Sequence, residues 1–175
     1  MKSVLISIKP KWCWKIARGE KTIEVRKNAP KEVPFKVYIY CSYGNDKENY
    51  MLGGCGKVIG EFICDKVYSI KNQGNSFVVA NEEQGVTNEI ARQSCLDYDD
   101  MVGYLGNKDG YGWHISDLKI YYKPKELSEF FKRCPTKEKG DCLSCDCLAD
   151  NDYGGICTNN LTRPPQSWQY VEELK

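Results

Sequence analysis

A lysine, a glutamate and an arginine lie close together in the stretch GEKTIEVRK, residues 19–27. Arg26 offers a planar fork that pairs with phosphate or carboxylate, and Lys21 offers a compact positive charge. Glu24 can accept a hydrogen bond from the exocyclic amine of a base, or orient its basic neighbours. These three side chains are candidate ligand-binding residues. If the protein is an enzyme, Lys21 and Glu24 are also a candidate catalytic pair, with Lys21 as base and Glu24 as acid or water-orienting group.

Two β-branched apolar residues alternate with these charges, and this alternation predicts a β-strand. Successive side chains of a strand point to opposite faces, so Ile23 and Val25 would face the core. Thr22, Glu24 and Arg26 would share the opposite face. The alternative interpretation is that Glu24 and Arg26 form only a surface ion pair, worth less than about 1 kcal/mol.

Basic residues are concentrated at the start of the chain. Residues 1–36 hold ten Lys and Arg against three Glu, although the whole chain has a formal net charge of only +1. This asymmetry indicates a basic face that meets an anionic partner, with a solvated lysine-rich surface as the alternative. His114, the only histidine, is a candidate for base stacking or proton transfer. Its alternative role is that of a hydrogen-bonded structural residue.

Further segments have the patterns of the elements that must position these residues. The predicted strands are 3–9, 22–27, 35–42, 57–70, 111–122 and 167–174. The predicted helices are 10–19, 87–96 and 97–106, with a helical turn at 125–133. Gly60 is a predicted bulge or close backbone approach, Asp97 a helix N-cap and Pro124 a strand end. Together they predict a single α+β domain over residues 1–175, built as a β-barrel of about six strands with short helices.

A cysteine-rich segment, residues 134–157, is predicted to be an insertion within this domain. It holds five of the ten cysteines and few large apolar residues, so a bound metal is the predicted source of its fold. Paired thiolates spaced Cys-x-x-Cys and a set of four sulfur ligands are typical of structural zinc. The predicted ligands of one zinc are Cys134, Cys142, Cys145 and Cys157, with Cys147 as the alternative to Cys145. The competing interpretations are a disordered thiol-rich loop and disulfides formed on oxidation.

The sequence contains no segment typical of a secretory signal or a membrane span. Its first apolar run, VLISI, is too short and is followed by Lys9 and Pro10. We therefore expect a cytoplasmic protein that does not bind a membrane. Thiols stay reduced in the cytosol, which argues against a disulfide scaffold. Cys41 and Cys64, within predicted strands, are expected to be buried small hydrophobic residues.

The order of ISIKP, a short helix and GEKTIEVRK resembles the ASCH domain family, the activating-signal-cointegrator homology domains. The family signature is Gly-x-Lys-x-x-Glu-x-Arg, and here it is filled by Gly19, Lys21, Glu24 and Arg26. The segments GKVIGEF, YGWHISDLKIYYKPKELSEF and RPPQSWQYVEE also resemble bacterial and phage-type members, so the resemblance covers most of the chain outside 134–157. It implies a PUA-like β-barrel, a cleft bordered by the signature, and a role in binding RNA or modified nucleosides.

Some ASCH-like proteins are amidohydrolases that remove an acyl group from modified cytidine with a lysine, a threonine and a glutamate. The resemblance implies Lys21 as that lysine, but Glu24 stands where the threonine is expected, and Thr22 lies two residues away. No motif locates the glutamate, for which the loose candidates are Glu82, Glu83 and Glu89. Other members resemble ribonucleases in activity.

Binding is therefore favoured over catalysis, with RNA or a nucleotide-like molecule as the expected ligand. The predicted lining of the cleft is Lys21, Glu24 and Arg26, with Lys9 and His114 as additional candidates. The first alternative is a hydrolase that acts on a modified nucleoside or on RNA. The second is a protein-interaction module of phage or mobile-element origin that uses the acidic segment 81–110.

Overall fold

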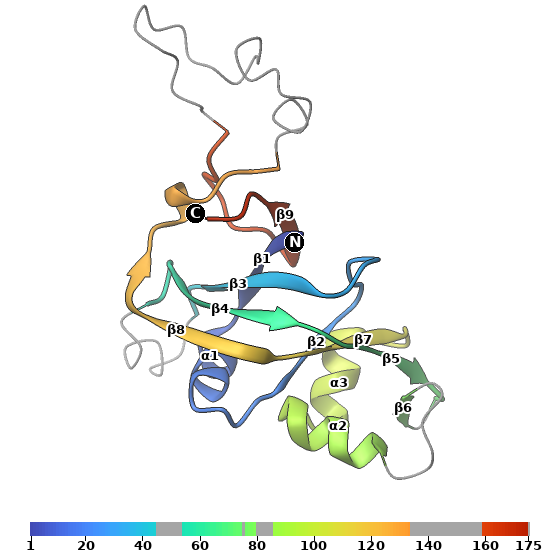
Figure 1. Ribbon diagram of the computed structural model, residues 1–175. Helices are drawn as coiled ribbons and strands as arrows, with labels where there is room; N and C mark the ends of the chain where they lie inside the picture. Colours follow the sequence, from blue (N-terminus) through green and yellow to red (C-terminus); the bar gives the residue numbers. More distant parts are fainter. Residues whose placement is uncertain (45–53, 75, 80–85, 134–158, 175) are drawn as a thin grey trace, which may run out of the picture.

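Two β-sheets form the framework of the computed structural model, which describes residues 1–44, 54–74, 76–79, 86–133 and 159–174 (Figure 1). The five-stranded sheet has the order β8-β4-β3-β1-β9, in which only β1 and β3 run parallel. The four-stranded sheet has the order β2-β7-β5-β6 and is antiparallel. The strands are β1 (Ser3–Ile8), β2 (Ile23–Arg26), β3 (Phe35–Cys41), β4 (Val58–Cys64), β5 (Val67–Asn72), β6 (Phe77–Val79), β7 (Gly110–His114), β8 (Ser116–Lys125) and β9 (Trp168–Val171).

The prediction of a closed barrel of about six strands is wrong, because in the described part of the chain the two sheets stay separate. The predicted strand at 57–70 divides into β4 and β5, and the one at 111–122 divides into β7 and β8. In both cases the two halves belong to different sheets: β4 and β8 to the five-stranded sheet, β5 and β7 to the four-stranded sheet. Periodicity could not reveal these breaks, since the alternation of apolar and polar residues resumes within one or two residues on the far side of each.

His114 lies at the corner where both divided segments pass from one sheet to the other. Its Nδ1 is 2.7 Å from Asp65 Oδ1, and its backbone N–H donates to the carbonyl of Lys66. The hydrogen bond from His114 lowers the pKa of the Asp65 carboxyl. These contacts join the end of β7 to the bend between β4 and β5, which is a structural role for His114.

Three helices and one 3₁₀ turn complete the described fold: α1 (Pro10–Ala17), α2 (Val86–Ser94), α3 (Tyr98–Leu105) and η2 (Leu127–Glu129). Pro10 occupies the first turn of α1, where its missing N–H costs nothing. Gly19 follows α1 with a φ of 72°, a conformation that stops the helix and suits glycine. Asp97 caps α3 as predicted, because its Oδ1 accepts from the backbone N–H of Asp100 at 2.7 Å.

The core has three parts, one on each side of the five-stranded sheet and one under the four-stranded sheet. Between the sheets and α1, the largest buried side chain is Trp113, which packs edge-on against Phe35. A second cluster joins Ile23 and Val25 of β2 to apolar residues of α2 and α3. Figure 1 shows both helices beside the four-stranded sheet. The third cluster covers the opposite face of the five-stranded sheet and includes Phe130.

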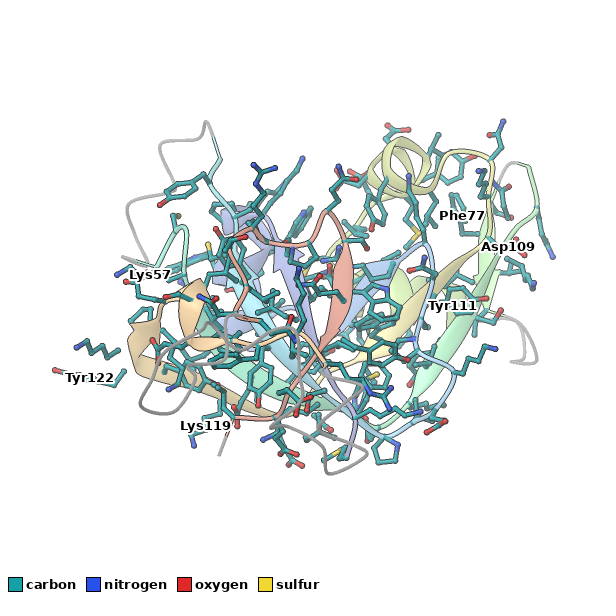
Figure 2. All side chains as sticks on the ribbon, turned by 90° about the horizontal axis from the view of Figure 1, so that it is seen from above. Lys57, Phe77, Asp109, Tyr111, Lys119 and Tyr122 are labelled. Carbon is teal, nitrogen blue, oxygen red and sulfur yellow. The ribbon has the colours of Figure 1, made fainter. Side chains whose placement is uncertain are left out.

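Strand β8 is an edge strand that packs closely on β4 at Gly60. A Cβ atom at this glycine would lie 2.5 Å from the carbonyl oxygen of Lys119, so the predicted close approach is confirmed. Figure 2 shows Lys119 and Tyr122 at the periphery of the molecule. The prediction that Pro124 ends the strand is wrong, because β8 continues to Lys125. An edge strand tolerates proline, since one of its sides has no hydrogen-bond partner.

The predicted zinc insertion, residues 134–157, lies outside the described residues. Within the described ranges, no three His, Cys, Asp or Glu side chains are grouped so that they could hold a metal ion. None of the helices described there has the length and apolar character needed to span a bilayer.

Candidate functional site

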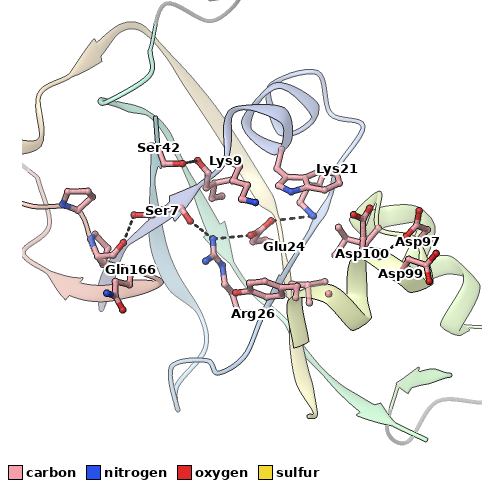
Figure 3. Close-up of a pocket in the computed structure, with 18 residues that line it drawn as sticks. Ser7, Lys9, Lys21, Glu24, Arg26, Ser42, Asp97, Asp99, Asp100 and Gln166 are labelled. Carbon is pink, nitrogen blue, oxygen red and sulfur yellow. Dashed lines mark hydrogen bonds and ion pairs between the residues drawn. The ribbon is translucent and has the colours of Figure 1, made fainter. Parts of the chain in front are cut away.

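A pocket of about 840 Å³ opens where the end of β1, the start of α1, strand β2 and helix α3 meet (Figure 3). A volume of this size is typical of small-molecule and cofactor sites. The segment 164–166 forms a further wall and is attached to β1, because Ser7 Oγ donates to the Pro165 carbonyl at 2.6 Å. The residues that line the pocket are Ser7, Ile8, Lys9, Trp12, Lys21, Glu24, Val25, Arg26, Ser42, Leu96, Asp97, Asp99, Asp100, Gly103, Tyr104, Pro164, Pro165 and Gln166.

Strand β2 directs its apolar and charged side chains to opposite sides, as its alternation predicts. Ile23 and Val25 pack in the cluster with α2 and α3, while Glu24 and Arg26 line the pocket, which Val25 also borders. All four residues of this strand are nonetheless buried. The side chains of Glu24 and Arg26 are only 8% and 6% exposed, so their ion pair is not the surface pair considered as the alternative.

Lys21, Glu24 and Arg26 form one connected network on the floor of this pocket. Glu24 Oε2 lies 3.3 Å from Lys21 Nζ, and Glu24 Oε1 lies 3.0 Å from Arg26 Nη2. Figure 3 shows the carboxylate between the two basic groups. With Lys21 protonated, the network contains two positive charges and one negative charge.

Lys21 also closes the C-terminal end of α2. Its Nζ donates to the carbonyl of Ser94 at 2.6 Å, and the neighbouring backbone N–H of Thr22 donates to the carbonyl of Gln93 at 2.9 Å. These carbonyls belong to the last turn of a helix and have no partner within it. Burial lowers the pKa of the Lys21 ammonium, and the nearby Glu24 carboxylate only partly opposes that shift.

Arg26 has a donor without a partner. Its Nη2 donates to the carbonyl of Ser7 at 2.7 Å and contacts Glu24, but its buried Nε has no hydrogen-bond partner in the described part of the chain. An unsatisfied buried donor is costly, by about 1 to 3 kcal/mol. The side chain that bears this unused donor lines the pocket.

Two aromatic side chains and a row of aspartates form the upper walls. Trp12 on α1 has cations close to its ring, with Lys11 Nζ at 4.5 Å and Lys21 Nζ at 5.2 Å from the centroid. Tyr104 on α3 also lines the pocket. The first turn of that helix adds the exposed acids Asp97, Asp99 and Asp100 to the rim.

The pocket brings together four of the five predicted ligand-binding residues. Lys21, Glu24 and Arg26 lie on the floor and Lys9 on the rim, whereas His114 is not among the lining residues. Of the loose candidates for a third catalytic residue, Glu89 pairs with Arg92 and does not line the pocket. Glu82 and Glu83 lie outside the described residues.

Sequence reasoning missed most of the pocket walls. It assigned no ligand-binding role to Trp12, Ser42, Tyr104 or Gln166, all of which line the cavity. The one available signal was the rigid RPPQ stretch before the last strand, which includes Gln166. The other walls come from segments that are distant in sequence and have no shared motif.

Comparisons with known proteins identify the fold. No protein-family model matches the sequence, and no curated protein matches it either. Among solved structures, the chain is similar to an ASCH protein from Zymomonas mobilis, with a TM-score of 0.58, 16% identity, and 98% of this chain and 89% of that chain covered. A tyrosine-to-phenylalanine variant of the Zymomonas mobilis protein gives a TM-score of 0.57 at 15% identity, covering 99% of this chain and 92% of that chain. The chain therefore has the ASCH-domain fold.

Proposed function

We propose that the protein binds a nucleotide or a segment of single-stranded RNA in this pocket. The observation that carries the proposal is the buried Lys21–Glu24–Arg26 network, with its excess positive charge, on the floor of a cavity of about 840 Å³. The association of ASCH domains with RNA supports the same choice.

The energetics of the network favour a ligand with anionic or strongly accepting groups. Removing an ion from water costs several kcal/mol, and apolar residues of similar volume often stabilise a fold at least as well as a buried ion pair. The lowered pKa of Lys21 indicates that Glu24 does not fully offset this cost. A phosphate or a base carbonyl in the pocket would supply an acceptor for Lys21 and Arg26.

The walls suit the remaining parts of a nucleotide. Trp12 and Tyr104 offer aromatic faces, and stacking of a base on such a face is worth about 1 to 3 kcal/mol. The carboxylates of Asp97, Asp99 and Asp100 can accept from ribose hydroxyls or exocyclic amines.

Binding of short single-stranded RNA should weaken as salt rises, because each phosphate contact releases a counterion. We expect Lys9→Gln to reduce the slope of log affinity against log salt by about 0.7, the contribution of one contact to a single strand. The matched control is Lys119→Gln, on a distant strand, which should leave affinity and slope unchanged. Fluorescence anisotropy at several salt concentrations measures the affinity and its salt slope. Equal salt slopes for wild type and Lys9→Gln would contradict a phosphate contact by Lys9.

Affinity for a nucleoside monophosphate should fall at alkaline pH. The groups that face Lys21 are Glu24, Arg26 and Cys95, and burial is the largest cause of its lowered pKa. The charge of Lys21 is therefore present below this lowered pKa and lost as pH rises through it, before an exposed lysine titrates near 10.5. Calorimetric titrations at increasing pH should show this loss for wild type, and a Lys21→Met variant should lack it. Equal pH dependence in both proteins would exclude Lys21 as the titrating group.

A hydrolase is the second candidate function, and the observation that favours it is the same lowered pKa. A buried lysine that loses its proton more readily than usual is a potential general base, and Glu24 lies 3.3 Å from it. Chromatography of acylated nucleosides after incubation with the protein separates the two functions. A binding protein returns them unchanged, whereas a hydrolase releases product and loses that activity in Lys21→Met.

A further inference from the structure

Three thiols from three separate segments meet behind the pocket wall. Cys41 Sγ at the end of β3 lies 3.8 Å from Cys55 Sγ, in the turn that precedes β4. The Cys13 thiol of α1 donates to the carbonyl of Ile8 at 3.5 Å and is a close enough neighbour of Cys41 to lower its pKa. Cys13 and Cys41 are fully buried, whereas Cys55 is partly exposed. The expectation that Cys41 is a buried small residue is confirmed, but its sulfur has two thiol neighbours.

The backbone holds Cys41 and Cys55 in a fixed relation. The N–H of Gly56 donates to the carbonyl of Cys41 at 2.7 Å, and the N–H of Cys41 donates to the carbonyl of Lys57 at 2.9 Å. Both bonds pair Cys41 with the two residues that directly follow Cys55. A disulfide requires the sulfurs to approach to about 2.05 Å. The remaining approach from 3.8 Å is within the range of side-chain rotation about a backbone that is already paired.

We propose that Cys41 and Cys55 form a reversible disulfide by exchange with a low-molecular-weight disulfide, RSSR. The thiolate of Cys55, the accessible partner, attacks one sulfur of RSSR, forms a Cys55–S–S–R bond and releases RS⁻. The thiolate of Cys41 then attacks the Cys55 sulfur, forms the protein disulfide and releases a second RS⁻. The two protons lost by the cysteines convert these ions to two RSH, so the cysteines lose two electrons and RSSR gains them.

The exposure of the two thiols sets this order of steps, since Cys55 is partly exposed and Cys41 is fully buried. Burial and the neighbouring Cys41 raise the pKa of Cys55 to about 11, which makes the first attack slow. The neighbouring Cys13 and Cys55 thiols lower the pKa of Cys41, which favours the second attack. Cys64 lacks these features, since burial raises its pKa to about 12 and its thiol donates to the Lys66 carbonyl.

The proposed disulfide adjoins the pocket wall directly. Ser42 follows Cys41 and lines the pocket, and both its backbone N–H and its hydroxyl donate to the carbonyl of Ile8, at 2.9 and 3.2 Å. The same carbonyl accepts from the Cys13 thiol at 3.5 Å. Oxidation of Cys41 therefore acts on a residue whose neighbour contributes to the cavity. The disulfide depends only on the contact between the thiols and does not require that the pocket bind a nucleotide or RNA.

Peptide mapping of the full chain tests the proposal. After incubation of the native protein with glutathione disulfide and acid quenching, trypsin separates the two cysteines because Lys47 lies between them. The expected product is a disulfide that links peptides 37–47 and 48–57, disappears on reduction, and raises Tm by about 6 to 12 °C as a closed loop of this length should. A link from peptide 37–47 to peptide 12–15, which carries Cys13, would overturn it, as would no reaction or a link to residues 134–157.

A pair of variants sharpens the result. In Cys41→Ala the second attack is impossible, so glutathione should remain attached to Cys55 and appear as an adduct on peptide 48–57. Cys95→Ala, which removes a partly exposed thiol elsewhere, should leave the 37–47 to 48–57 link unchanged. If Cys41→Ala fails to fold, the wild-type map decides alone. A glutathione adduct that persists on wild-type Cys55 without the internal link would overturn the proposal.

Discussion

Glu24→Ala is expected to lower the free energy of unfolding by about 3 to 5 kcal/mol, the cost of removing one partner from a buried charge network. The substitution leaves Lys21 and Arg26 buried, 2% and 5% exposed, with like charges and no carboxylate between them. For a chain of this length the loss corresponds to a fall in Tm of about 6 to 20 °C. Denaturant unfolding followed by fluorescence measures the change. A loss below about 1 kcal/mol would contradict the burial of the network.

Two controls isolate the buried charge. Glu32→Ala removes a carboxylate that also pairs with a lysine, but at an exposed position, and should leave Tm unchanged. A triple variant with Lys21→Met, Glu24→Leu and Arg26→Met removes every charge of the network. Apolar residues can replace a buried ion network without loss of stability. The triple variant should therefore unfold at a higher denaturant concentration than Glu24→Ala. It should also lose ligand binding, which would separate the functional role of the charges from their effect on the fold.

Arg26→Ala is expected to weaken nucleotide or RNA binding by about 2 kcal/mol or more, which is about 30-fold or more in Kd. Arg26 lines the pocket as part of the buried charge network, and its buried Nε has no hydrogen-bond partner in the described residues. The variant also removes hydrogen bonds to Ser7 and Glu24, so its stability should fall as well. Calorimetric titration should therefore be done well below its Tm.

Arg26→Lys is the companion variant, because it keeps the positive charge and loses the planar fork. An intermediate affinity would assign the difference between the two variants to charge and the remainder to fork geometry. Lys119→Ala is the matched basic control, on a distant strand and outside the pocket. If all three variants bind as tightly as wild type while remaining folded, Arg26 does not contact the ligand.

The fold and the site are coupled through the same residues. Lys21 contacts the last turn of α2, and Arg26 contacts the end of β1, so the network that faces the pocket also connects separate elements. A substitution there will change stability and binding together. This coupling is the reason that each binding variant is paired with an unfolding measurement.

Local patterns in the sequence were sufficient for several of the individual elements. Alternation placed Ile23 and Val25 on the core side of β2, Pro10 and Gly19 marked the ends of α1, and Asp97 marked the start of α3. Capping, glycine conformation and strand periodicity depend on residues that are neighbours in the chain. They can therefore be recognised from a single sequence. The resemblance to ASCH domains likewise rested on a short signature, and the fold agrees with it.

Only the tertiary structure decided how these elements combine. The predicted strands 57–70 and 111–122 were each divided between the two sheets. Lys21, Glu24 and Arg26 were buried, although the sequence also allowed a surface ion pair. His114 lies at a corner between the sheets and not in the pocket. The tertiary structure also brought together Trp12, Tyr104 and Gln166, and three cysteines from α1, β3 and a turn. The physical reason is that burial and side-chain contact are set by segments distant in sequence, whereas periodicity reports only which face a residue occupies.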